Sequence, residues 1–376
     1  NVKLLLLFAL CLSAFSVTTG LLEIDKQRAT LERLLEYDEK DRQDVLEKHS
    51  GYGNLGYYTR HLTYTPPSEL AFAAIGQRDV MPWKHRVRLL ALEGQIYEND
   101  ADNPELAYVG RIDFTFLIAV LTPLFVILLL HDVRASERAH GRFDLLLTTS
   151  HNPDKLWQLR SLVGAMSLMA ALLLPFIIGA FISGSAPQHI IAVTGICFAQ
   201  ISFWTLTCHC FGKKPTSAPQ IASILLGLWL VTTIVIPVSG DKLIGQMVDS
   251  PIGGEISLAQ REAVNDAWDL PHEATFEPFI HRHPEWQNHT RMDSNWDWKW
   301  YYAFQQVGDQ SVETMSQAYR DAIYHKDELA SQVAWLSPAM LVQRAMTRLA
   351  KTDTQAMLQY EQKIREFHAE LRAFYY

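Results

Sequence analysis

Five apolar runs constrain this chain more than any other feature of its sequence. Each is close to the roughly 20 residues that an α-helix needs to cross about 30 Å of hydrocarbon. The runs occupy residues 2–19, 114–130, 161–183, 190–208 and 219–240. Two long polar blocks, 21–110 and 241–376, lie between or after them. The pattern predicts a mainly α, polytopic membrane protein with five visible transmembrane helices and two mostly helical exterior domains.

This pattern divides the chain into segments. We expect a first transmembrane helix at 1–20, a first periplasmic domain at 21–110, a second transmembrane helix at 113–131, a cytoplasmic loop at 132–160, three further transmembrane helices at 161–240, and a second periplasmic domain at 241–376. A cleaved signal peptide is the alternative for the first run, because small residues follow its apolar core. That run continues into the amphipathic segment 21–48 without a clear cleavage site, which favours one long helix.

Charge predicts which side of the membrane each loop occupies. The loops 131–160 and 212–218 are rich in Lys and Arg, whereas the turn 184–189 has neither. Because short positive loops stay in the cytoplasm, both polar blocks and the turn 184–189 should lie outside. The polar blocks are acidic and the whole chain has net charge −8, which argues against nucleic-acid binding.

Histidines and cysteines offer only weak metal candidates. The cysteines Cys11, Cys197, Cys208 and Cys210 all lie in or beside apolar runs, so no disulfide is expected in the exterior blocks. His281 and His283 could share one ion from an extended segment, with His272 and His289 nearby. No cysteine or clear carboxylate partner completes a ligand shell, so no metal is predicted.

The C-terminal segment has the most regular periodicity. Its apolar residues repeat at spacings of 3 and 4: Met357, Tyr360, Ile364, Phe367, Leu371 and Phe374. This seam predicts a helix that pairs with another helix, and residues 21–48 running the opposite way are the candidate partner. No helix-stop signal follows, and five spans leave this end outside, so we expect a sixth span beyond it.

An aromatic segment precedes that seam. Trp296, Trp298, Trp300 and Tyr301 alternate in a way that does not fit one helix face. They are candidates for an exterior surface that contacts a partner or cargo; an aromatic-rich core is the alternative.

Catalytic and ion-coupling motifs are missing from the sequence. It has no HExxH, GxSxG or Walker-type motif, and the four internal apolar runs have no Asp, Glu, Lys or Arg. Ion-coupled transporters place ionisable groups or broken helices near the midplane of the membrane. If this protein moves a cargo, a partner must therefore supply the energy, and the chain itself is not predicted to be an enzyme.

The charged segment 137–147 after the second run resembles the E-R-E-x-G-T-L-x-L-L-L segment of type-2 ABC exporter permeases. Glu137, Arg138, Gly141 and the leucines Leu145 and Leu146 match that segment. Ala139, Arg142 and Phe143 depart from it. The resemblance implies that 137–147, including Arg142 and Phe143, forms a coupling helix that contacts a cytoplasmic ATPase. A positively charged flank that only fixes topology is the alternative.

Other stretches resemble one subfamily of these permeases, which has two large exterior domains and is often described in terms of multicopper enzyme maturation. They lie at 76–80, 92–98, 103–106, 282–286, 300–302, 305–309 and 336–338. The resemblance implies six spans, a bacterial inner membrane location, an ABC ATP-binding subunit that holds ATP and Mg, and a second permease subunit. The large exterior blocks suggest a periplasmic partner.

Two other classes stay open at the level of sequence. One is a membrane-anchored sensor or receptor, and the other is a metal-binding membrane enzyme. The cargo, the direction of transport and the symmetry of the permease pair are not defined by these residues.

Overall fold

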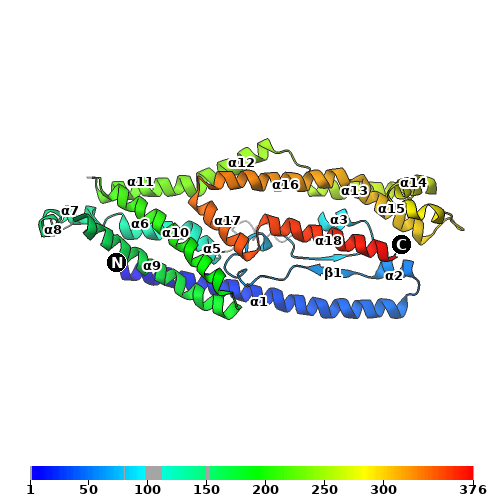
Figure 1. The fold of residues 1–376 in the computed structure, drawn as a ribbon, viewed down its shortest axis with the longest axis horizontal. Coiled ribbons are helices and arrows are strands. Elements are labelled where there is room, and N and C mark those ends of the chain that lie inside the picture. Colours follow the sequence, from blue (N-terminus) through cyan, green and yellow to red (C-terminus); the bar gives the residue numbers. More distant parts are fainter. Residues whose placement is uncertain (1, 80, 98–111, 150–152, 215, 376) are drawn as a thin grey trace.

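The computed structural model describes residues 2–79, 81–97, 112–149, 153–214 and 216–375. The described chain is mainly α-helical and elongated, with apolar helices at one end and polar helices at the other (Figure 1). Among the described residues, five helices are long and apolar enough to cross a membrane: Val2–Lys48, Phe114–Ala139, Asp154–Ser183, Pro187–Gly212 and Ala218–Met247. Each contains one of the five apolar runs, so the predicted set of long apolar helices is confirmed.

The first of these, α1 (Val2–Lys48), is one continuous helix. This confirms that segment 21–48 extends the first apolar run. The apolar half of α1 packs along α9 (Pro153–Ser183), where the Ser13 hydroxyl donates to the carbonyl of Leu172 at 2.7 Å. Its polar half runs along the other end of the molecule (Figure 1).

Two of the long helices contain a π-helical turn just before a proline. The second comprises α5 (Phe114–Phe116), the π-turn η2 (Leu117–Leu121) and α6 (Thr122–Leu130). Pro123 has no N–H to donate back along the helix. The carbonyl of Ala119 instead accepts a bond from Gln200 in α10 (Pro187–Gly212) at 3.2 Å. A neighbouring helix thus satisfies a backbone group that the proline leaves open.

The fifth long helix is built the same way, from α11 (Ala218–Leu230), η3 (Val231–Val235) and α12 (Ile236–Met247). Pro237 again lies just after the π-turn. The helix continues past Gly240, the residue at which the fifth span was predicted to end, as far as Met247. Gly240 allows close packing, because a Cβ there would lie 2.8 Å from the Val333 side chain.

A buried non-helical segment, 70–75, lies against the apolar helices. Its six residues are all buried. Thr115 donates to the carbonyl of Ala73 through its backbone N–H at 2.9 Å and its hydroxyl at 2.8 Å. Thr352 donates to the carbonyl of Ala74 at 2.9 Å. These bonds satisfy backbone groups that burial would otherwise leave unpaired. The sequence did not indicate this segment, because six apolar or small residues are too few for a span.

The close approach of α1 to this segment gives a first prediction. A Cβ at Gly20 would overlap the backbone carbonyl oxygen of Phe72. Gly20→Ala should therefore lower the free energy of unfolding by about 1–3 kcal/mol, the usual effect of overpacking. Thermal unfolding of the purified protein in detergent measures this change.

Gly195→Ala in α10 is the matched control, because no described atom lies within 4 Å of a Cβ at that position. Alanine favours a helix over glycine by about 1 kcal/mol, so this variant should unfold at the same or a higher temperature. Equal unfolding temperatures for Gly20→Ala and the unaltered protein would show that α1 and segment 70–75 are not packed as described.

The first polar block contains a small sheet between helices. After α2 (Tyr52–Tyr58) come β1 (His61–Tyr64), the 3₁₀ turn η1 (Gly76–Asp79), β2 (Lys84–Val87) and α3 (Leu92–Tyr97). The strands pair antiparallel, from His61 opposite Val87 to Tyr64 opposite Lys84. We expected only short helices and turns here. The glycine-rich break predicted for 49–56 is wrong for its second half, which is helical.

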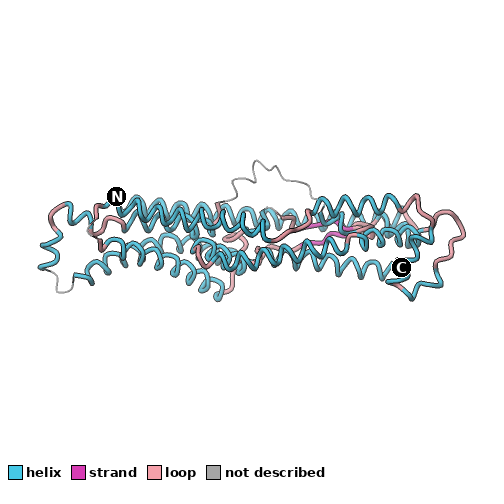
Figure 2. The backbone as a smooth tube through the Cα atoms, turned by 90° about the horizontal axis from the view of Figure 1, so that it is seen from above, coloured by secondary structure: helices cyan, strands magenta, loops and turns pink. Residues whose placement is uncertain are grey.

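The second polar block is helical, as predicted. Its elements are α13 (Gly253–Asp266), α14 (His272–Arg282), the 3₁₀ turn η4 (Pro284–His289), α15 (Trp298–Ser311), α16 (Glu313–Ala334), α17 (Pro338–Ala350) and α18 (Thr354–Tyr375). The periodic C-terminal segment therefore forms the predicted helix, α18. Figure 2 shows that helices and loops make up nearly all of the described chain, with the strands confined to the polar end.

The predicted partner of α18 is wrong. Its residues Tyr360 and Ile364 pack with Val87, Leu92 and Ile96, which belong to β2 and α3. The sheet lies between α18 and the polar half of α1 (Figure 1). Because the two strands are short and polar, their pattern did not reveal a layer between the two helices.

Candidate functional site

A helical hairpin lies at the tip of the apolar end, farthest from the polar helices (Figure 1). It consists of α7 (Ala135–Ala139) and α8 (Phe143–Thr149), between α6 and α9. Five of the seven residues that the sequence identified as a candidate coupling segment lie in these two helices, and the other two, Gly141 and Arg142, lie in the turn that joins them. The single coupling helix expected over 137–147 is therefore replaced by two short helices that are joined by a turn at Gly141.

Gly141 allows the sharp turn between the two helices. Its φ of +69° lies in the left-handed region, which glycine adopts without a steric penalty. The backbone N–H of Gly141 donates to Arg138 at 3.1 Å, and that of Arg142 donates to Glu137 at 3.0 Å. This pair of bonds is the Schellman arrangement that ends a helix. The glycine therefore fixes where α7 ends and where α8 begins.

Glu137 ties the hairpin to α9. Its carboxylate accepts a bond from Arg142 Nε at 2.8 Å and another from Arg160 Nη1 at 3.0 Å. The Glu137 side chain is only 15 % exposed. A single carboxylate thus links α7, the turn and α9 through two charge-assisted bonds, which are stronger than neutral ones.

Arg138 joins the hairpin to the end of α10. Its guanidinium donates to the carbonyls of Lys214 at 2.7 Å and Gly212 at 3.3 Å. A cation at the C-terminus of a helix is favoured by the helix dipole. The two basic loops that we assigned to one side of the membrane therefore meet in space.

An aromatic stack supports the start of α8. The Phe143 ring lies 5.8 Å from the Trp157 ring at an interplanar angle of 15°, and Arg138 lies over Phe143. Trp157 is buried, with Arg134 and Arg160 over its ring. The departure from leucine to phenylalanine at position 143 therefore places an aromatic ring at the base of the hairpin.

The tip of the hairpin is apolar and accessible. All seven residues of α8 are described and none is buried. Leu145 is 63 % exposed, while Leu146 and Leu147 are half-buried. The hairpin thus combines a base held by ion pairs with an exposed leucine on a short helix. This arrangement could insert into a groove of another protein without unfolding.

The four residues of the predicted aromatic surface differ in how exposed they are. Trp300 is 4 % exposed and packs with Phe304 and Phe276, so it belongs to the core of the polar end. Trp298 and Tyr301 are half-buried, and Trp296 is 43 % exposed. Since α15 begins at Trp298, residues 298 and 300 lie on different faces of one helix. Only Trp296 retains the exposure that a contact surface needs.

The two histidines of the weak metal candidate, His281 and His283, also differ in their surroundings. His281 is exposed, whereas His283 Nδ1 lies 2.9 Å from the Glu285 carboxylate and its Nε2 lies 2.6 Å from the Gln306 amide nitrogen. Both ring nitrogens of His283 therefore have polar neighbours. Within the described ranges, no three His, Cys, Asp or Glu residues are grouped so that they could hold a metal ion.

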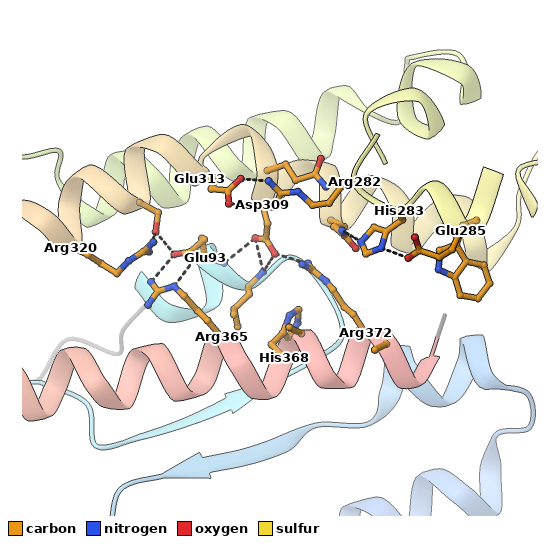
Figure 3. A pocket seen from close by; sticks show the side chains of 17 residues that line it. Glu93, Arg282, His283, Glu285, Asp309, Glu313, Arg320, Arg365, His368 and Arg372 are labelled. Carbon is orange, nitrogen blue, oxygen red and sulfur yellow. Dashed lines mark hydrogen bonds and ion pairs between the residues drawn. The ribbon is translucent and has the colours of Figure 1, made fainter. Parts of the chain in front are cut away.

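A charged network in the polar end was not predicted as a site (Figure 3). Arg365 in α18 donates to both carboxylate oxygens of Glu93 in α3, at 2.8 and 2.9 Å. Asp309 in α15 accepts from the backbone N–H groups of Leu92 at 2.8 Å and Glu93 at 3.0 Å, and pairs with Arg372 at 2.5 Å. The network joins the first polar block to the second.

A sequence signal for this network does exist. The polar residues Glu361, Arg365, His368 and Arg372 repeat at spacings of 4, 3 and 4, beside the apolar seam of the same helix. Such a repeat places them on one helix face. The seam alone suggested apolar pairing, so this polar stripe was overlooked.

Together, the fold and the hairpin define a mainly helical protein with five candidate membrane-spanning helices and a large polar end. Residues 254–376 match the family described as "Domain of unknown function (DUF3526)". This match covers the second polar block from α13 to α18. No curated protein and no solved structure matches the chain. Of the stretches that resemble exporter permeases, 103–106 lies outside the described residues.

Proposed function

We propose that this chain is the membrane-spanning permease subunit of an ATP-driven ABC-type exporter of the bacterial inner membrane. The α7–α8 hairpin would contact an ATP-binding subunit that carries ATP and Mg, and a second permease subunit would complete the transporter. This chain would carry no catalytic residue, since its roles are mechanical.

One observation carries the proposal: an exposed apolar helix on a rigid base, at the tip of the apolar bundle. An ion pair between Glu137 and Arg160 fastens that base to α9, and hydrogen bonds from Arg138 to backbone carbonyls fasten it to the end of α10. A lever must be rigid where it joins the moving body and accessible where it is pushed. An ordinary charged flank that only sets topology requires neither feature.

Contacts at the other end of the bundle support the proposed sidedness. The turn after α9 reaches the first polar block, where Ser185 Oγ donates to the Glu69 carbonyl at 3.0 Å and the Ala186 N–H donates to the Glu69 carboxylate at 2.9 Å. The basic loops at Arg138 and Lys214 meet at the opposite end. Polar blocks in the periplasm and basic loops in the cytoplasm fit this separation.

Leu145→Asp tests the docking role. The unaltered chain, tagged and purified in detergent from its native host, should bring down an ATP-binding protein with ATPase activity. A charge on the exposed face of α8 should reduce that recovery at least about tenfold, because burying an unpaired carboxylate in an apolar groove is costly. Mass spectrometry and an ATPase assay measure the result.

Leu258→Asp in α13 is the matched control, because Leu258 is 56 % exposed and lies in the polar end. It should leave recovery unchanged. Equal recovery with Leu145→Asp, or no ATP-binding protein with the unaltered chain, would count against the proposal.

A further inference from the structure

The charged network of the polar end borders a cavity of about 600 Å³ (Figure 3). This volume is within the usual range for sites that bind small molecules. Helices α3, α14, α15, α16 and α18 and the turn η4 all contribute to its walls. The cavity therefore lies where the first and second polar blocks meet.

Charges of both signs line this cavity. Four arginines and four carboxylates face it: Arg282, Arg320, Arg365, Arg372, Glu93, Glu285, Asp309 and Glu313. His368 adds no positive charge near neutral pH, because burial and the neighbouring Arg372 lower its pKa to about 4. The balance of charges suits a ligand with both a positive and a negative group, whereas a simple anion or cation would meet opposing charges.

Two amide side chains on α15 also line the cavity. Gln306 and Gln310 are one turn apart, so they share a helix face. Gln306 is 5 % exposed and its amide oxygen has no hydrogen-bond partner among the described residues. The Gln310 amide nitrogen is likewise buried without a partner in the described part of the chain. Buried polar groups in folded proteins nearly always have partners, so these two amides have the capacity to bond to a ligand in the cavity.

We propose that this cavity binds a short peptide with free termini. An amide side chain offers one donor group and one acceptor, which complement the C=O and N–H of a peptide bond. Gln306 and Gln310 would bond to the peptide groups of the ligand. The exposed carboxylates Glu285 and Glu313 would receive its ammonium group, and the arginines its carboxylate.

The remaining walls allow small side chains. Ala369 and Ala373 are on the α18 side of the cavity, and Leu92 and Trp286 add apolar surface. Such a surface accommodates apolar side chains without selecting one, so the termini and the peptide groups would dominate recognition. This proposal goes beyond the transporter assignment, and it does not depend on an ATP-binding subunit.

Titration calorimetry on the full chain in detergent, with no ATP-binding protein present, tests the proposal with trialanine as the probe. We expect saturable binding with a Kd of about 1 mM or tighter. N-acetyl-trialanine and trialanine amide each lose one charged terminus. Each should bind roughly tenfold more weakly, since hydrogen bonds to charged groups contribute more than neutral ones.

Gln310→Leu is the decisive variant, because its amide nitrogen has no partner to lose within the described protein. It should fold normally and bind trialanine roughly three- to tenfold more weakly. Gln362→Leu, on the exposed side of α18, is the control and should bind as the unaltered chain does. Any one of three results would overturn the proposal: no saturable binding of trialanine, binding of both blocked peptides as tight as that of trialanine, or unchanged affinity for trialanine in Gln310→Leu. If trialanine does not bind but the unaltered chain still recovers an ATP-binding protein, only the peptide proposal fails and the proposed transporter function is unaffected.

Discussion

Replacing Arg365 with methionine should lower the free energy of unfolding of the polar end by about 3–5 kcal/mol, the usual effect of leaving one member of a buried ion pair alone. The side chains of Arg365 and Glu93 are 13 % and 11 % exposed. Burial lowers the pKa of Arg365, but the hydrogen bonds and charge of Glu93 outweigh it and raise that pKa overall. Denaturant unfolding in detergent, followed by tryptophan fluorescence, measures the loss.

Arg282→Met is the matched control for the same chemical change. Arg282 pairs with Glu313, and these side chains are 50 % and 54 % exposed. Exposed pairs contribute about 0–1 kcal/mol, so this variant should unfold almost as the unaltered protein does. Similar losses in both variants would mean that burial of the Arg365 pair has no special effect on stability.

A double variant distinguishes the cost of leaving Glu93 unpaired from the cost of losing the Arg365 side chain itself. Arg365→Met combined with Glu93→Leu removes the closest charged pair but leaves the buried carboxylate of Glu361, which lies 3.6 Å from Arg365 Nη1. Replacement of a buried pair by apolar residues is often neutral or stabilising. We expect it to recover part of the stability lost in Arg365→Met, because Glu361 still loses its cation. No recovery would indicate that the lost bond from Ser316 Oγ to Glu93, at 2.7 Å, and the Glu361 carboxylate left without Arg365 outweigh the removal of the pair.

Gly141→Pro should uncouple ATP hydrolysis from movement of the polar end. Proline fixes φ near −65° and has no N–H, whereas Gly141 has a φ of +69° and donates to Arg138. The turn between α7 and α8 therefore cannot persist. If the hairpin is the lever, the assembled complex should retain ATPase activity and lose the ATP-dependent change in the polar end.

Spin labels provide a readout that needs no known cargo. Cysteines introduced at Glu47 and Gln362, on α1 and α18, would report the distance between these helices after Cys11 and Cys210 are replaced, because both native thiols are exposed. We expect ATP with vanadate to change this distance in the unaltered complex and to leave it unchanged in Gly141→Pro.

Gly184→Pro is the matched control for the hairpin turn. Gly184 also has a positive φ, +75°, and also donates its N–H one turn back, to Phe181 at 3.2 Å. It lies in the turn between α9 and α10, at the end away from the hairpin. This variant should keep the ATP-dependent distance change. Preservation of that change in Gly141→Pro would refute the lever.

Residues that are close in sequence account for most of what could be predicted. Each apolar run became a long helix, and segment 21–48 extended the first of them as expected. The segment 137–147 was recognised as one charged stretch, but a single helix was expected there, and the structure has two helices joined at Gly141. Local pattern is sufficient where a helix closes its own hydrogen bonds.

Predictions that depended on contacts between distant residues were less accurate. The seam of α18 was recognised, but its partner was misassigned to α1 because β1 and β2 are four residues each and polar. Trp300 was grouped with Trp296, although the start of α15 directs one into the core and leaves the other exposed. Neither outcome can be read from spacing alone.

The sequence by itself determined the helical class and the five apolar helices, because hydropathy and helical period act over a few residues. Tertiary structure alone decided that segment 70–75 is buried against α1, that Glu93 meets Arg365, and that Gln306 and Gln310 face a common cavity. Segment 70–75 and α1, Glu93 and Arg365, and the walls of the cavity each bring together elements that are far apart in the chain. Packing of whole elements decides which residues meet. The polar stripe of α18 marks one face of that helix, but its spacing does not show which element the face contacts.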